Sequence, residues 1–340
     1  MGQPRRRPHR EGLVTDLLVR TTDYHTAGEP FRIVTGGVEP LQGETILDKR
    51  RFALERLDTV RKLLVHEPRG HADMYGCFVT EPNDAGADLG VVFFHNAGYS
   101  TACGHGTIAL VTWALETGRL EASELETRVV VDVPSGRLET LASVRDGRVE
   151  RVRFTNVPAY VEALGVDAAG LSVDVAFGGA FYASVESPLP VRKESLPRLI
   201  ELGRDIKREL EAGGEFVHPV EPELREIYGV IFFERIGDGP RLRQRNVTVF
   251  ADGEVDRSPC GSGTSARLAL LDASGELPRG EELAHESIVG TVFTARVAGD
   301  TEVAGQRAVV TEVEGSAYRT GEHEFVLDER DELGTGFLLR

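Results

Sequence analysis

The chain has 340 residues, of which 41% are hydrophobic, and it carries a formal net charge of −16. This length is enough for two domains with hydrophobic cores, while the acidic balance disfavours nucleic acid or an anionic membrane as a partner. No apolar run approaches the length of a transmembrane helix. The three cysteines are few and odd in number, which favours free thiols in a reducing compartment over a disulfide framework.

Residues 1–15 form a basic, proline-rich stretch that we expect to be a disordered tail. The apolar run that follows is short and is interrupted by Asp16, so it does not qualify as a signal peptide. Arg6 stands where the N-myristoylation pattern requires serine or threonine. With the free thiols, these features predict a cytoplasmic protein.

The first half of the chain is predicted to contain many strands and one surface helix before its first cysteine motif. The helix is expected at 46–64, where Ala53, Leu57, Val60 and Leu64 have the spacing of one helical face. Strands are expected at 31–34, 77–80, 89–95, 128–133, 138–144 and 149–154. This content suggests a curved sheet wrapped round one buried helix.

One short unit occurs twice, as CGHGT at 103–107 and as CGSGT at 260–264. A shift of 157 positions places Cys103 on Cys260 and Gly104 on Gly261. Each copy has the order of a thiol, a glycine-rich bend, about three turns of helix and a glycine that ends the helix. Because two of the three cysteines lead the two copies, we expect two related halves that bring both thiols to one cleft.

The residues after each bend, 108–115 and 266–271, are apolar on nearly all sides, which is typical of a helix buried all round. The glycines leave the helix entrance open, so that backbone N–H groups can hold an anion there. A thiol at this entrance lies at the positive end of the helix dipole. We therefore expect the pKa of each thiol to be lowered toward the thiolate form.

The second half repeats the plan of the first. A glycine-interrupted strand is expected at 175–185 and a helix at 195–211. Further strands are expected at 227–234, 246–251, 291–297, 308–313 and 325–327. The boundary falls near 156–163. We expect a first domain over 16–157, a second over 158–327, and a C-terminal segment, 328–340, that returns to the first.

Two helix entrances that face each other would hold a carboxylate between them and place one sulfur on each side of it. One sulfur, as thiolate, could then take a proton from one face of a carbon while the other delivers a proton to the opposite face. Because an α-proton is weakly acidic, burial and exclusion of water would have to supply much of the stabilisation. This plan needs neither a cofactor nor a metal.

Four motifs resemble those of the proline racemase family: YHTAGEP, EPRGHADM, YSTACGHGT and EVDRSPCGSGT. The resemblance runs from about Asp23 to the C-terminus. It implies an α/β fold like that of diaminopimelate epimerase, with two pseudo-symmetric domains, each a curved sheet wrapped round a central buried helix. It also implies cofactor-independent chemistry at the α-carbon of a small substrate, proline or hydroxyproline. The sequence does not determine the oligomeric state, for which a homodimer is one option.

The resemblance assigns roles to seven residues. Cys103 and Cys260 correspond to the acid/base pair, and Asp256 resembles the family aspartate near the substrate nitrogen. The backbone cradle for the substrate carboxylate corresponds to Gly104, His105, Gly261 and Ser262.

Three activities occur in this family: proline racemase, 4-hydroxyproline 2-epimerase and trans-3-hydroxy-L-proline dehydratase. The dehydratases typically have threonine at the second cysteine position, so Cys260 favours a racemase or epimerase. The segments HTAGEPFRIVTGG, RGHADMYG, HNAGYST and FGGAFYA resemble the dehydratase branch instead, and Ala102 replaces the usual methionine. Inversion is our leading hypothesis, and dehydration is the alternative.

Other interpretations explain less of the sequence. A metal site at Cys103 and His105 lacks a clear second pair of ligands, and a Cys–His hydrolase leaves the second cysteine unexplained. A non-catalytic protein that binds carboxylate or phosphate would not need thiols. Cys77 reads as a buried core residue, and Glu29 and Asp73 read as loop scaffolding.

Overall fold

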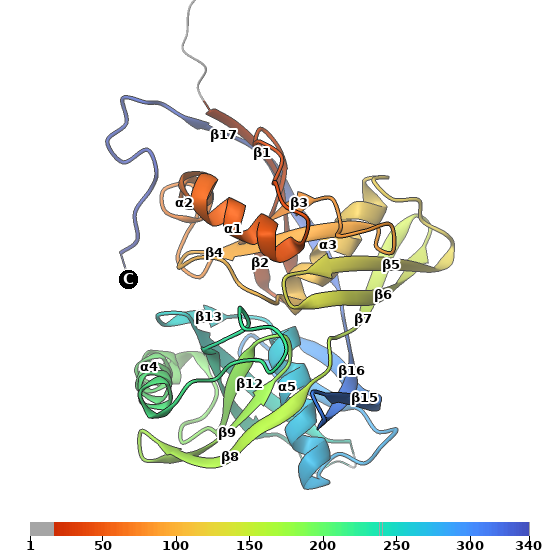
Figure 1. Cartoon of the computed structure of the whole chain (residues 1–340), viewed down its shortest axis with the longest axis vertical. Coiled ribbons are helices and arrows are strands. Elements are labelled where there is room, and N and C mark those ends of the chain that lie inside the picture. The colour runs from red at the N-terminus through yellow and green to blue at the C-terminus, as the bar shows by residue number, and fades with distance from the viewer. Residues whose placement is uncertain (1–16, 238, 240, 340) are drawn as a thin grey trace, which may run out of the picture.

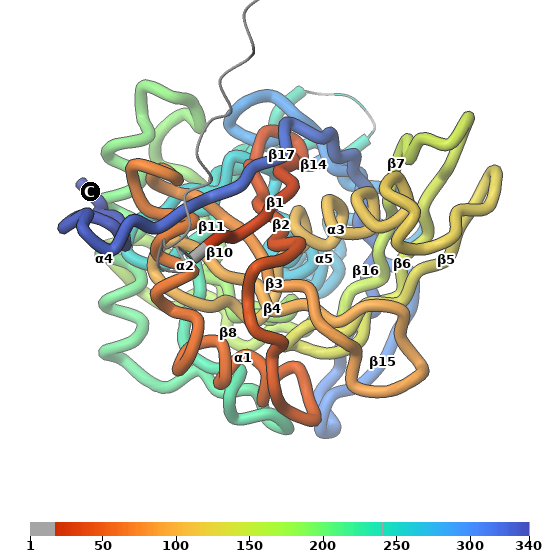
Figure 2. Tube along the Cα trace, turned by 90° about the horizontal axis from the view of Figure 1, so that it is seen from above, coloured from red at the N-terminus to blue at the C-terminus, as the bar shows by residue number. Residues whose placement is uncertain are grey.

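The computed structural model describes residues 17–237, 239 and 241–339. Figure 1 shows two halves stacked along the long axis, the upper one containing helix α3 (Gly104–Glu116) and the lower one helix α5 (Gly261–Ser274). Viewed down that axis, both helices lie near the middle of the molecule, surrounded by strands (Figure 2). The expected basic tail, residues 1–15, lies outside the described residues.

The upper half wraps a mixed sheet round α3. Its strands are β1 (Leu17–Thr26), β2 (Glu29–Gly36), β3 (Tyr75–Thr80), β4 (Leu89–His95), β5 (Leu125–Val133), β6 (Gly136–Arg145), β7 (Arg148–Thr155) and the returning β17 (Ala317–Leu327). Helix α3 packs on β1, β2, β3, β6, β7 and β17. Two further helices, α1 (Ile46–Arg56) and α2 (Asp58–Val65), cover the outer face of β4.

The lower half repeats this arrangement round α5. Its strands are β8 (Tyr160–Ala168), β9 (Leu171–Phe177), β10 (Phe181–Glu186), β11 (Ile227–Arg235), β12 (Arg243–Phe250), β13 (Glu254–Asp256), β14 (Leu283–Ser287), β15 (Val292–Val303) and β16 (Gln306–Gly315). A short 3-10 turn (Lys193–Ser195) and α4 (Leu196–Gly213) lie on the outside. Strand β16 pairs with β7 of the upper half, so the sheet is continuous between the halves. The expected α/β fold, with two similar halves round two central helices, is confirmed.

Both central helices are buried as their sequences predict. Every residue of α3 from Gly104 to Leu115 is buried, and Thr112 satisfies its hydroxyl by donating to the Ile108 carbonyl at 2.8 Å. The one charge in the middle of α5, Arg267, donates to Gln244 at 3.0 Å and lies 3.7 Å above the ring of Phe233. These contacts compensate for burying a guanidinium.

The predicted helix at 46–64 is in fact two helices. The break falls at Leu57, whose φ of −116° and ψ of 9° are not helical. Asp58 begins the second helix and pairs with Arg61 at 2.6 Å, an acidic start that the helix dipole favours. The apolar spacing continues across the bend, so periodicity alone could not reveal it.

The chain returns to the upper half earlier than expected. Strand β17 runs antiparallel to β1 along its whole length, from Ala317 opposite Thr26 to Leu327 opposite Leu17. We expected a strand only at 325–327, and none at 17–26. Both strands carry polar residues where an alternating pattern requires apolar ones; Asp23 of β1, for example, is buried in an ion pair with Arg32 at 2.7 Å.

Candidate active site

The N-termini of α3 and α5 meet where the two halves join. A Cβ atom added to Gly104 would lie 2.6 Å from the Cα of Gly261, and one added to Gly261 would lie 2.8 Å from the Cα of Gly104. Carbon atoms do not approach this closely in proteins, so no side chain fits at either position. The glycines of the repeated unit therefore allow the two helix entrances to touch.

The two thiols lie at this junction. Cys103 is the N-cap residue of α3 and Cys260 that of α5, and both are buried. Both line one cavity, together with Tyr75, Ala102, Gly104, His105, Tyr182, Tyr228, Thr248, Phe250, Asp256, Gly261 and Ser262. All seven residues singled out from the sequence are thus brought to a single cavity. Its volume of about 10 Å³ is the room that about one water molecule needs.

The two cysteines differ in backbone and partners. Cys103 is extended, and its sulfur accepts a hydrogen bond from the Gly106 N–H at 3.3 Å. Cys260 has a φ of +63°, a conformation uncommon for any residue but glycine. Its sulfur lies 3.8 Å from the hydroxyl of Tyr182. Strained backbone of this kind is often found at functional sites.

The expected lowering of the thiol pKa values is wrong for this conformation. Burial raises the pKa of Cys103 well above its ordinary value, against the effect of the Gly106 N–H. Burial, followed by the nearby carboxylate of Asp256, raises the pKa of Cys260 to about 12. Loss of water around each sulfur outweighs the hydrogen bond from a backbone N–H in the first turn of its helix, so both thiols are protonated at neutral pH in this closed cavity.

Asp256 and His105 are charged or polar side chains that line the cavity with the two thiols. A carboxylate oxygen of Asp256 lies 3.9 Å from Nδ1 of His105, while the other accepts the Ser258 N–H at 2.8 Å, as a turn residue would. The His105 ring lies 3.5 Å from the sulfur of Cys103. Burial lowers the pKa of His105, so the imidazole is neutral.

Three tyrosines that the sequence did not single out complete the cavity. Tyr75 donates to Ser100 at 2.5 Å, and its hydroxyl lies 2.7 Å from that of Tyr228. Tyr182 pairs with Ser262 at 2.7 Å. Burial raises the pKa of all three tyrosines well above the ordinary value. Tyr75 and Tyr182 lie within motifs quoted above. The alternation of side chains along a strand does not show which face of the strand packs against the other half, so their place in the cavity could not be predicted.

A buried ion pair joins the halves beside the thiols. Glu29 of the upper half, fully buried, accepts the backbone N–H of Arg257 at 2.7 Å and pairs with its guanidinium at 3.2 Å. Asp73 accepts the N–H of Val255 at 3.2 Å and lies 3.6 Å from the same guanidinium. Glu29 and Asp73 therefore hold the segment that leads to Cys260.

The remaining residues weighed from the sequence do not line the thiol cavity. Cys77 is buried within β3, and His71 is exposed, with its Nδ1 2.8 Å from the carbonyl of Ala72. His25 lies against Tyr318, and His95 lines a neighbouring cleft. Within the described ranges, no three histidine, cysteine or acidic side chains are placed to hold a metal ion. No described helix is long and apolar enough to cross a membrane.

Two similar α/β halves with a cavity at their junction define a fold that other solved proteins share. A predicted epimerase from Pseudomonas aeruginosa has this fold, with a TM-score of 0.58 and 13% identity over 90% of this chain and 98% of that one. Residues 21–338 match the family model described as proline racemase. The chain belongs to the proline racemase family.

Relatives within this family are similar over nearly the whole chain. A trans-3-hydroxy-L-proline dehydratase from Bacillus cereus is 46% identical over 95% of this chain and 98% of its own length. A 3-hydroxyproline 2-epimerase from Burkholderia multivorans is 47% identical over 94% of this chain and 98% of its own length. The structure of a hydroxyproline epimerase from Agrobacterium vitis, with bound trans-4-hydroxy-L-proline, has a TM-score of 0.88. It is 33% identical over 95% of this chain and 96% of that one.

Proposed function

We propose that this protein inverts the α-carbon of 3-hydroxyproline without a cofactor, using Cys103 and Cys260 as the acid and base on opposite faces of the substrate. The observation that carries the proposal is the presence of two thiols in one cavity at the entrances of two buried helices. A single nucleophile would require only one of them, and a binding site would require neither.

The carboxylate of the substrate would bind between the helix entrances. The backbone N–H groups of Gly104, His105, Gly261 and Ser262 lie in the first turns of α3 and α5, where N–H groups have no partner within the helix. Both helix dipoles present their positive ends there. Asp256, buried in the same cavity, would receive the ring nitrogen, which is positively charged.

Proton transfer would begin with one thiol ionised. The positive ring nitrogen lowers the pKa of a thiol close to it, which opposes the effect of burial. The thiolate takes the α-proton and becomes a thiol. The electron pair left at the carbon takes a proton from the thiol on the opposite face, which becomes the thiolate. One turnover therefore exchanges the states of the two sulfurs, and the reverse reaction starts from the product form.

The choice of substrate rests on the chemistry of the intermediate and on the relatives. After the α-proton has left, the electron pair either takes a proton at the same carbon or expels the hydroxyl from the neighbouring carbon. A thiol on the opposite face favours the first outcome, and Cys260 would supply it in this chain. The Burkholderia multivorans relative bears the matching name, 3-hydroxyproline 2-epimerase.

Dehydration of trans-3-hydroxy-L-proline is the second candidate, since the Bacillus cereus relative is a dehydratase of nearly equal similarity. We also propose a cytoplasmic location for the enzyme, supported by three free cysteines.

A proton NMR assay in deuterium oxide separates these functions. The substrates are L-proline, trans-4-hydroxy-L-proline and trans-3-hydroxy-L-proline, each incubated with the protein and with heat-inactivated protein as control. The proposal predicts that trans-3-hydroxy-L-proline gives its 2-epimer, cis-3-hydroxy-D-proline, with deuterium at the α-carbon. Loss of water without the epimer would establish the dehydratase, and no reaction with any of the three would contradict both.

A further inference from the structure

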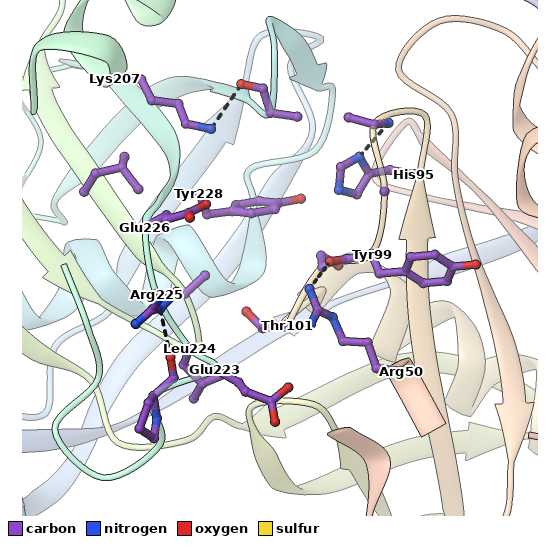
Figure 3. Close-up of a pocket in the computed structure, with 17 residues that line it drawn as sticks. Arg50, His95, Tyr99, Thr101, Lys207, Glu223, Leu224, Arg225, Glu226 and Tyr228 are labelled. Atoms are coloured by element: carbon purple, nitrogen blue, oxygen red, sulfur yellow. Dashed lines mark hydrogen bonds between the residues drawn. The ribbon is translucent and has the colours of Figure 1, made fainter. Parts of the chain in front are cut away.

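A much larger cleft lies beside the thiol cavity, between the two halves. Its volume is about 680 Å³, against about 10 Å³ for the cavity that holds the thiols. One wall comes from the upper half, with Arg50, His95 and Tyr99, and the other from the lower half, with Lys207 and residues 222–228. Figure 3 shows these two walls facing each other.

Tyr228 separates the two spaces. It is among the residues that line the cleft and also among those that line the thiol cavity. Its ring is stacked on that of Phe250, with centroids 5.5 Å apart and an angle of 14° between the planes. Its hydroxyl is held by the hydroxyl of Tyr75 at 2.7 Å. One hydrogen bond and the ring contacts with Phe250, Tyr182 and His95 hold the side chain between the cleft and the thiols, so a rotation of this ring would join the two spaces.

Arg50 gives the cleft a group that attracts a carboxylate. Its guanidinium donates to the carbonyl of Tyr99 at 2.7 Å (Figure 3), while its Nε is buried with no hydrogen-bond partner among the described residues. The acidic side chain that most raises its pKa, Glu223, is already paired with Arg51. Burial lowers the pKa of Arg50, which means that its charge is incompletely compensated. Arg50 lines the cleft, so a carboxylate there would supply the missing charge.

We propose that this cleft is the entry site for the substrate, where Arg50 receives the carboxylate of the imino acid and Tyr228 is the gate that admits it to the thiols. The identity of the substrate rests on the proposed function. The gate does not, because it governs the access of any small molecule to Cys103 and Cys260.

The gate is tested by the modification of the thiols with two methanethiosulfonates, one with a methyl and one with a benzyl group. The rate at each cysteine is measured by mass spectrometry of peptides, with buried Cys77 as internal control. If the open conformation of Tyr228 makes up 10% or less of the molecules, Tyr228→Ala should raise the rate of modification by the bulky reagent about tenfold or more, because the ring is then absent. The rise with the small reagent should be smaller.

Two comparisons keep this test decisive. Tyr228→Phe retains the ring but loses the bond to Tyr75, and should give an intermediate rise in a protein whose packing is intact. Tyr318→Ala, at an exposed position of β17, should leave both rates unchanged. An equal rise with both reagents would mean that only the thiol pKa had changed, and this result, like no rise at all, would overturn the gate.

The role of Arg50 is tested by the rate at which trans-3-hydroxy-L-proline binds, followed by stopped-flow tyrosine fluorescence. Arg50→Met should lower the association rate constant about tenfold or more, because the cleft loses a charge that attracts the carboxylate, whereas Arg56→Met, an exposed neighbour on α1, should not change it. An unchanged association rate constant in Arg50→Met would overturn this role. Absence of binding to the wild type would instead contradict the proposed substrate and leave the result for Tyr228 standing.

Discussion

Cys103 and Cys260 occupy the same place in two helices, yet their surroundings differ. The first accepts a backbone N–H, and the second has a positive φ and a tyrosine hydroxyl as neighbour. The thiol pKa values are set by burial more than by the backbone N–H groups in the first turns of the two helices. The cost of burying a thiolate keeps both sulfurs protonated until a positively charged group arrives. The consequences for the stability of the protein and for the choice between epimerisation and water loss can be measured separately.

The raised thiol pKa values predict a loss of stability at alkaline pH. Because the thiols ionise in the unfolded chain at a pH of about 8.5 but only at a higher pH in the folded one, their effect on folding is constant below that pH. Stability then falls as pH rises toward the folded value of about 12 for Cys260. The Tm of the wild type should therefore fall more steeply than that of Cys260→Ala above about pH 9. Parallel curves in differential scanning fluorimetry would contradict the raised pKa.

Replacing Cys260 by threonine should change the product. A hydroxyl cannot deliver its proton to carbon as a thiol does, so the intermediate from trans-3-hydroxy-L-proline would lose its 3-hydroxyl instead of being protonated at the α-carbon. We expect Cys260→Thr to lower epimerisation about 100-fold or more and to retain or increase water loss, followed by NMR. Epimerisation at the wild-type rate would contradict the role given to this thiol.

Among the structural elements, the short segments between the halves matter most for the site. Strand β13 belongs to the lower half, but the chain from Val255 to Arg257 is held by carboxylates of the upper half. The glycines at the starts of α3 and α5 set how closely the helices approach. Each feature gives a prediction that does not involve the thiols themselves.

Breaking the ion pair at β13 should loosen the junction. Arg257→Met leaves fully buried Glu29 without its guanidinium, so we expect the free energy of unfolding to fall by about 2–3 kcal/mol, measured by denaturation with urea. Glu29→Gln combined with Arg257→Met should recover part of this loss. Arg151→Met, which breaks an exposed pair with Glu314, is the control and should cost about 1 kcal/mol or less. Equal losses of stability for the two pairs would refute the proposed role of the ion pair between Glu29 and Arg257.

Closing of the helix entrances should be blocked by one methyl group. Gly104→Ala places a Cβ 2.6 Å from the Cα of Gly261, so the entrances must move apart and the N–H groups no longer converge. We expect turnover to fall about 100-fold, as for small displacements of bound groups. Gly213→Ala, at the end of α4 with open space around it, provides the same substitution without the clash. Normal turnover in Gly104→Ala would exclude the close approach as a requirement.

Much of the molecule could be predicted from its sequence because the repeated unit carries strong signals. Stretches with apolar residues on all sides of the helix predicted both central helices. The motifs shared with the proline racemase family predicted seven residues that line one cavity. Features set by contacts between distant segments could not be predicted. The orientation of Tyr228 depends on Phe250 and Tyr75, and strands β1 and β17 depend on each other.

For the molecule as a whole, the two halves enclose the thiols in a space with room for about one water molecule. An imino acid is larger than this, so binding requires the cavity to expand, by movement of the halves, of Tyr228 or of both. A closed cavity excludes water from an unstable carbanionic intermediate. The central claim is that the closed junction places one sulfur on each face of a single carbon.

This claim is tested most directly by the rate of inversion of trans-3-hydroxy-L-proline in Cys103→Ser and in Cys260→Ser, followed by polarimetry and by NMR in deuterium oxide. We predict that each substitution lowers inversion about 100- to 10,000-fold, the range expected for loss of a general acid or base, while Cys77→Ala retains it. Inversion at the wild-type rate by either serine variant would contradict the two-thiol account.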